Sequence, residues 1–301
     1  MENARWQRWL VAAHALLLAL WLALLWRTSP ALALAGLVLV PLASRLLMLP
    51  QFLLMVAVRA RAGEPRLPAA VLLRAWWAEA RWAARVFGWW QPFCHRTLPD
   101  WLPPAPAGAP AARGVVLVHG YLCNRGFWRP WQRLLRARGH AHVALTLEPA
   151  FGSIDDYAAA IDAAVQQVEQ ATGRPPLLVG HSMGGLAIRA WLRATPGAAA
   201  RVHRVATLGT PHQGTWAATH ARTTNGRQMV LHGPWVEALA AAEPPGLRAL
   251  FVCWHSDADN VVYPQAAVAL AGAQHRAVPG AGHVELAFHP QVLRECLALL
   301  D

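Results

Sequence analysis

The chain begins with two long apolar runs. Residues Trp9 to Trp26 carry no formal charge, and their number is close to the roughly 20 residues that cross a bilayer as a helix. After a breaker at residues 28–30, a second run extends from Ala31 to about Val58, with Arg45 inside it. The pattern predicts a helical membrane-anchoring hairpin over residues 1–66. Its second span should run from about Ala31 to Leu49, because Arg45 then lies near one end and can reach the surface.

Two alternatives remain for these runs. Arg5 and Arg8 precede the first run, and Ala31-Leu32-Ala33 resembles a cleavage site, as in a secretory signal peptide. Against this, another apolar run follows where a mature soluble domain should begin. In the second alternative both runs are buried core helices, although neither shows the polar stripe of a surface helix.

Arginines at both outer ends of the hairpin predict its orientation. Arg5 and Arg8 precede the first span, and Arg59, Arg61 and Arg66 follow the second, so both ends should face the cytoplasm. Four scattered cysteines fit a reducing compartment. The prediction is an inner-membrane protein with its C-terminal part on the cytoplasmic side; the alternative is a periplasmic or secreted protein after signal cleavage.

Residues 67–113 form a second segment. Between Pro68 and Phe93, apolar residues recur at helical spacing while most charged residues fall elsewhere on the wheel, which predicts an amphipathic helix. Its tryptophans suit either the headgroup boundary or packing on the neighbouring domain. Residues Pro99 to Arg113, rich in proline and alanine, predict an extended linker and a domain boundary.

Residues 114–301 alternate short β-branched runs with helical stretches. The predicted strands are 114–118, 141–147, 176–180, 202–208, 250–254 and 274–278, and the predicted helices are 130–138, 155–171, 184–194 and 290–300. This alternation is typical of the α/β class, with a mostly parallel sheet covered by helices on both faces.

Composition adds little beyond the apolar start. The chain is 55% hydrophobic and 14% charged, and all 27 basic residues are arginine, with a formal net charge of +11. These arginines are spread along the whole chain, whereas nucleic-acid binding needs them clustered on one element. We therefore expect no nucleic-acid partner, and expect the juxtamembrane arginines to favour anionic lipid.

The chemistry concentrates at Gly180-His181-Ser182-Met183-Gly184. A Gly-x-Ser-x-Gly between a buried strand and a helix makes a sharp turn that projects the serine hydroxyl above the sheet. The alternative is a tight turn without catalysis.

A serine nucleophile needs a base and a third group that orients the base. Among fourteen histidines, His283 follows a glycine-rich loop after the last predicted strand. Asp259 and Asp257 both follow the strand before it; we choose Asp259 as the acid, with Asp257 as the alternative. The order Ser, Asp, His is the one expected of the α/β-hydrolase fold.

The oxyanion of the intermediate needs N–H donors. The backbone of Met183 should supply one. The loop His119-Gly120-Tyr121 should supply the other through Tyr121, which leaves His119 to shape the loop.

The runs VVLVHGY, GHSMGG, LGTPHQGT, SDADNVVYP and PGAGH together resemble the bacterial triacylglycerol lipase and esterase branch of the α/β-hydrolase superfamily. The resemblance covers residues 114–301 and implies ester hydrolysis by Ser182, Asp259 and His283 through an acyl-enzyme, on an acyl ester or lipid. It also implies a cap at about 214–246. The motif residues expected near the substrate are His119, Gly120, His181 and His212.

The sequence departs from this family in its apolar N-terminal third, and no aspartate constellation marks a calcium site. We expect no metal and no cofactor. Rival hypotheses are an acyltransferase or thioesterase with the same triad, and a membrane-associated scaffold without turnover. Acyl length, head group and oligomeric state stay open.

Overall fold

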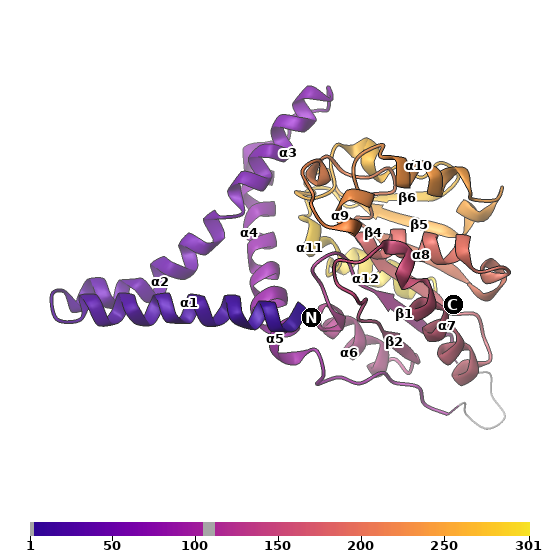
Figure 1. The fold of residues 1–301 in the computed structure, drawn as a ribbon, viewed down its shortest axis with the longest axis horizontal. Helices are drawn as coiled ribbons and strands as arrows, with labels where there is room; N and C mark the ends of the chain where they lie inside the picture. The colour runs from indigo at the N-terminus through magenta and orange to yellow at the C-terminus, as the bar shows by residue number, and fades with distance from the viewer. Residues whose placement is uncertain (1–2, 105–111) are drawn as a thin grey trace.

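The N-terminal helices stand apart from the sheet. The structure, a computed structural model, describes residues 3–104 and 112–301, so the middle of the predicted linker lies outside the described residues. Helices α1 (Asn3–Leu25) and α2 (Pro30–Leu46) lie side by side and project away from the rest of the molecule (Figure 1). Ser29 caps α2 by accepting a hydrogen bond from the Leu32 N–H at 3.4 Å.

Helices α3 (Leu49–Arg61) and α4 (Ala69–Arg85) return the chain to the sheet domain. Phe52 and Met55 of α3 are buried against Ala258 and Tyr263, which lie beyond the fifth strand. The predicted amphipathic helix is α4; a π-helical turn (Val86–Trp90) and α5 (Gln91–Cys94) continue it.

The sheet has six parallel strands in the order β2-β1-β3-β4-β5-β6. The strands are β1 (Val115–Val118), β2 (His142–Ala144), β3 (Leu177–His181), β4 (Arg204–Leu208), β5 (Phe251–His255) and β6 (Gln274–Ala277). The residues of β1 and β3 are all buried, as expected for the centre of a parallel sheet covered on both faces. The polar strand β6 lies at an edge.

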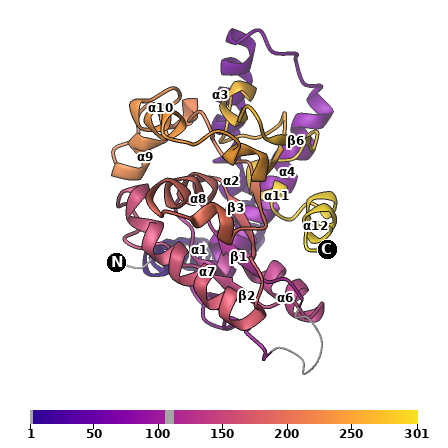
Figure 2. The same ribbon diagram turned by 90° about the vertical axis from the view of Figure 1, so that its right-hand side faces the viewer.

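Helices cover both faces of the sheet, as Figure 2 shows. On one face α7 (Ala158–Thr172) and α8 (Met183–Ala194) pack against Val116 and Val118. On the other, α6 (Arg129–Ala137) and α12 (Pro290–Leu297) pack against Val115 and Leu117. The predicted fold class is therefore confirmed: this is the α/β-hydrolase fold, preceded by apolar helices.

Between β4 and β5 the chain makes short elements. These include α9 (Thr224–Gln228) and α10 (Pro234–Ala241). Beyond α10, Glu243 forms a fully buried ion pair with Arg189 of α8, at 2.5 Å, which fixes this segment to the helix that follows Ser182. The last helix before α12 is the short α11 (His283–Leu286).

Candidate active site

Ser182 occupies the turn between β3 and α8, at the carboxyl edge of the sheet. Its backbone has φ 54° and ψ −127°, a conformation that L-residues rarely adopt and that is concentrated at functional turns. The flanking glycines permit the turn. A Cβ at Gly184 would lie 2.2 Å from the Val118 carbonyl oxygen, and one at Gly180 would lie 2.7 Å from the Gly185 nitrogen.

His283 is paired with Asp259, both of them buried. The imidazole Nδ1 lies 2.8 Å from a carboxylate oxygen of Asp259. The other carboxylate oxygen accepts the N–H groups of Val261 and Val262 at 2.9 and 2.8 Å. The carboxylate is thus held by its own loop, and it fixes the tautomer of the histidine with Nδ1 protonated, leaving Nε2 to accept a proton.

Asp257, the alternative acid, contacts a different loop. Its carboxylate accepts the Gly280 N–H at 2.6 Å, three residues before His283. Asn260 holds His283 more directly, because its side-chain oxygen accepts the His283 N–H at 3.2 Å. Geometrically, Asp259 is the partner of the imidazole and Asp257 is a loop contact.

Ser182 and His283 line the same cavity, which has a volume of about 600 Å³. Tyr121 and His181 line it too. Gly120 approaches Ser182 so closely that a Cβ there would lie 2.8 Å from the serine Cβ. Three segments far apart in the sequence, the loops that follow β1, β3 and β6, therefore meet at this cavity.

The electrostatics of the site raise the pKa of the His283 imidazole. Burial lowers the pKa of the His283 imidazole, but the charge and hydrogen bond of Asp259 outweigh burial and hold that pKa above its ordinary value. The neighbouring His181 has the opposite balance: burial and the proximity of His283 hold its pKa well below the ordinary value. A neutral His181 can donate from Nε2 to the His283 carbonyl oxygen, 3.1 Å away.

Only some of the residues expected near the substrate line the cavity. His181 lines it, whereas His119 and His212 lie in the packing. His119 donates from Nδ1 to the Gly120 carbonyl at 2.8 Å and accepts the Leu147 N–H at Nε2 at 2.9 Å. Burial lowers its pKa to about 4, so it shapes the loop as a neutral ring. His212 contacts Thr207 at 3.0 Å.

Sequence reasoning missed Glu79 of α4. Its fully buried carboxylate accepts the N–H groups of Val284 and Glu285, each at 2.9 Å, so it positions the first turn of α11, which His283 begins. Burial raises the pKa of this carboxyl to about 7, although the two N–H donors oppose the shift. The only available signal was a glutamate on the apolar side of an otherwise amphipathic helix.

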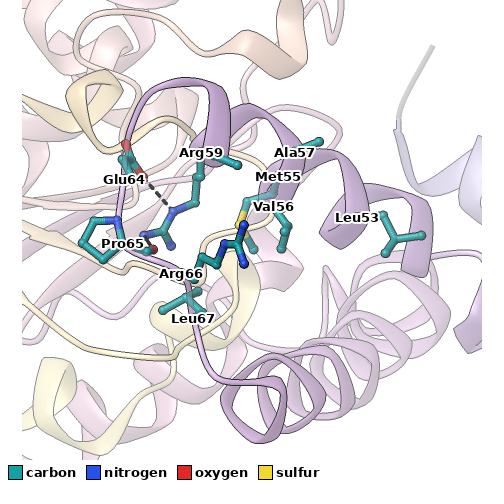
Figure 3. Close-up of a pocket in the computed structure, with 10 residues that line it drawn as sticks. Leu53, Met55, Val56, Ala57, Arg59, Glu64, Pro65, Arg66 and Leu67 are labelled. Carbon is teal, nitrogen blue, oxygen red and sulfur yellow. Dashed lines mark hydrogen bonds and ion pairs between the residues drawn. The ribbon is translucent and has the colours of Figure 1, made fainter.

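The N-terminal helices also contact the loop that carries Asp259. Arg59 of α3 forms an ion pair with Glu64 at 2.7 Å (Figure 3) and donates to the Asp257 carbonyl oxygen. Gln51, also on α3, accepts the side-chain N–H of Asn260 at 2.9 Å. The loop with the acid and the loop with the histidine are therefore braced by α3 and α4.

One family model matches part of the chain. A model described as the Alpha/beta hydrolase family matches residues 115–217, the segment that contains the Ser182 turn. No curated protein matches the chain.

Solved structures agree on the fold. The mature form of Bacillus licheniformis lipase BlEst2 is similar over 66% of this chain and 96% of its own, with a TM-score of 0.57 and 18% identity. Its propeptide form is similar over 64% of this chain and 52% of its own, with a TM-score of 0.53 and 19% identity. At these identities the likeness is one of fold, and it extends to about two thirds of the chain.

Proposed function

We propose that this protein is a serine carboxylic-ester hydrolase that acts on acyl esters. The observation that carries the proposal is the convergence of Ser182, at the turn between β3 and α8, with the Asp259–His283 pair on one cavity. The α/β-hydrolase fold and its lipase neighbours are consistent with this chemistry. Fold alone would not specify the reaction.

In the proposed reaction His283 Nε2 removes the Ser182 proton as the hydroxyl attacks the acyl carbonyl. The imidazolium then protonates the departing alcohol, which leaves an acyl-serine. Water repeats the sequence: His283 takes its proton, the acid is released, and the proton returns to Ser182. Asp259 stabilises the imidazolium in both halves of the reaction.

The negative charge of the intermediate needs donors already in place. Met183 begins α8, whose first-turn N–H groups lack partners within the helix and carry the positive end of its dipole. We assign one oxyanion donor to the Met183 N–H and the other to the Tyr121 N–H in the loop against Ser182. The Tyr121 hydroxyl faces away to Thr223, at 3.1 Å.

We further propose that α1 and α2 anchor the protein in a membrane. The described residues contain two stretches, Asn3–Leu25 and Pro30–Arg61, that are long and apolar enough to be membrane spans, or a signal sequence. Large apolar side chains of the pair are exposed, Leu24 by 74% and Val38 by 68%. Exposed apolar surface of this extent indicates a lipid or protein contact.

Hydrolysis of a p-nitrophenyl ester series by detergent-solubilised protein tests the activity. We expect the wild-type protein to release p-nitrophenol and free acid, and Ser182→Ala to release neither above background. If wild-type protein releases p-nitrophenol only when an alcohol acceptor is added, the enzyme is an acyltransferase. An absence of turnover across the series would contradict the proposal.

A further inference from the structure

The cavity at Ser182 extends away from the triad, between the N-terminal helices. On α4 it is lined by Ala80, Ala83 and Ala84, on the π-helical turn that follows by Phe87, and on α1 and α2 by His14 and Ser44. None of the described residues between Gly214 and Gly246, where a lipase-type cap was expected, lines it. The wall that faces the nucleophile is therefore built by the segment that is foreign to the lipase pattern.

A second hollow, of about 540 Å³, continues the first. The two share lining residues on three helices, among them His14, Ala84 and Phe87. From there the second hollow passes along α1, beside Leu10 and Val11, to Trp6. Because they share these lining residues, the two hollows adjoin, and we treat them as one trough from Ser182 to α1.

The lining of the trough favours a hydrocarbon chain. Small alanines on α4 leave space, and Leu10, Val11 and Phe87 are apolar. Two charged groups near the triad are already engaged: Glu79 accepts backbone N–H groups, and the Arg45 guanidinium lies 4.8 Å from the centre of the Trp77 ring. Polar groups farther along, Asn3, Gln7 and Ser44, already donate to carbonyl oxygens, so a methylene chain displaces none of these hydrogen bonds.

The outer end of the trough lies on a helix that also faces outward. Leu10 lines the trough and is 62% exposed, and Trp9, one residue before it, is 67% exposed. Tryptophans at the end of an apolar helix are typical of the headgroup boundary. An acyl chain that leaves the bilayer beside Trp6 and Trp9 can therefore reach Ser182 without crossing water.

We infer that the trough between α1, α2 and α4 binds the acyl chain of a long-chain ester resident in the membrane, and that the substrate reaches Ser182 from the lipid phase. This inference rests on the proposed ester hydrolysis. It goes further in naming the substrate class and in assigning its binding to the N-terminal helices.

Photocrosslinking from the nucleophile tests the path of the chain. A long-chain alkyl fluorophosphonate with a diazirine near its tail is attached to Ser182 of the full-length protein and irradiated. We expect crosslinks in the peptide Trp9–Arg27 and in α4. Attachment to Ser182 followed by crosslinks within residues 214–246 would overturn the trough and leave the proposed function intact, whereas failure to attach would contradict the proposed function.

Substitutions in the trough test its role in catalysis. Ala84→Phe, which fills the shared wall, should lower kcat/KM for p-nitrophenyl palmitate by about tenfold or more relative to kcat/KM for the acetate. Val11→Phe, farther along the trough, should affect only the longest chains. Ala70→Phe, an exposed position on α4 outside the trough, is the matched control. Equal losses on both esters in Ala84→Phe and Val11→Phe, or no loss on either, would overturn the inference.

Discussion

At the scale of residues, the two candidate carboxylates of the site differ in the groups that they contact. Both Asp257 and Asp259 follow β5, and the sequence offered no decisive reason to prefer one. In the structure Asp259 contacts the imidazole at 2.8 Å, while Asp257 accepts the Gly280 N–H. The difference lies in side-chain direction within one loop, which a pattern of residue types does not encode.

We predict that Asp259→Asn lowers kcat by about 10⁴-fold, because the amide would favour the wrong tautomer of His283. Asp257→Asn should lower kcat by less than about tenfold, since only a loop contact is weakened. The check is kcat for a p-nitrophenyl ester at one pH for both variants and wild type. The reverse ranking would transfer the acid's role to Asp257.

The pH profile of activity should follow His283. Asp259 holds the His283 pKa above the ordinary 6.5, and the general base must be neutral. Activity is therefore present at higher pH and is lost as pH falls through a midpoint above 6.5. A profile of kcat/KM against pH should show this acidic limb. If the midpoint of the limb is the same in Asp259→Asn as in the wild type, the limb does not report the Asp259–His283 pair.

At the scale of elements, the alternation of runs was enough to predict the sheet. All six strands and the helices that cover them lie close to their predicted positions, because buried parallel strands leave continuous apolar runs. The bracing of the site by α3 and α4 was not predictable. Glu79 and Gln51 contact loops about 200 residues away. The sequence around either residue does not indicate that contact.

The contact that Glu79 makes can be measured through the pH dependence of unfolding. Its folded pKa of about 7 lies above the ordinary value of 4.5, so its contribution to stability is fully present below pH 4.5 and is lost as pH rises through about 7. The total is on the order of 3 kcal/mol. Glu79→Gln should remove this part of the pH dependence of thermal unfolding, measured in detergent.

The matched control is Glu237→Gln, which replaces an exposed carboxylate on α10. It should keep the wild-type pH dependence of unfolding. If Glu79→Gln also keeps that dependence between pH 4.5 and 7, Glu79 does not titrate as the structure implies.

The whole molecule combines a domain of the α/β-hydrolase fold with a projecting apolar pair of helices. Hydropathy predicted the apolar helices but not their position beside the cavity, because only the fold brings α1 and α4 to the hollows next to Ser182. Lipase motifs carry no information about a segment outside their family, so the cap expected at 214–246 said nothing about the N-terminal helices.

Attachment to the membrane should be apolar rather than electrostatic. With a formal net charge of +11, a peripheral protein would dissociate at high salt as charges are screened. We predict that the full-length protein stays in the membrane fraction after washes with 1 M salt (roughly a 3 Å screening length) and requires detergent for release. Release by salt would indicate a surface contact, and a shortened soluble form would indicate signal cleavage.

The most direct measurement of the central claim is covalent labelling of the nucleophile. Wild-type protein in detergent should react with a fluorophosphonate probe at one site, which mass spectrometry should place on Ser182, and His283→Ala should react far more slowly. Ser182→Ala should show no labelling while retaining the unfolding temperature of the wild type. Labelling of Ser182→Ala at the wild-type rate would contradict the assignment of Ser182 as the nucleophile, and with it the proposed hydrolase.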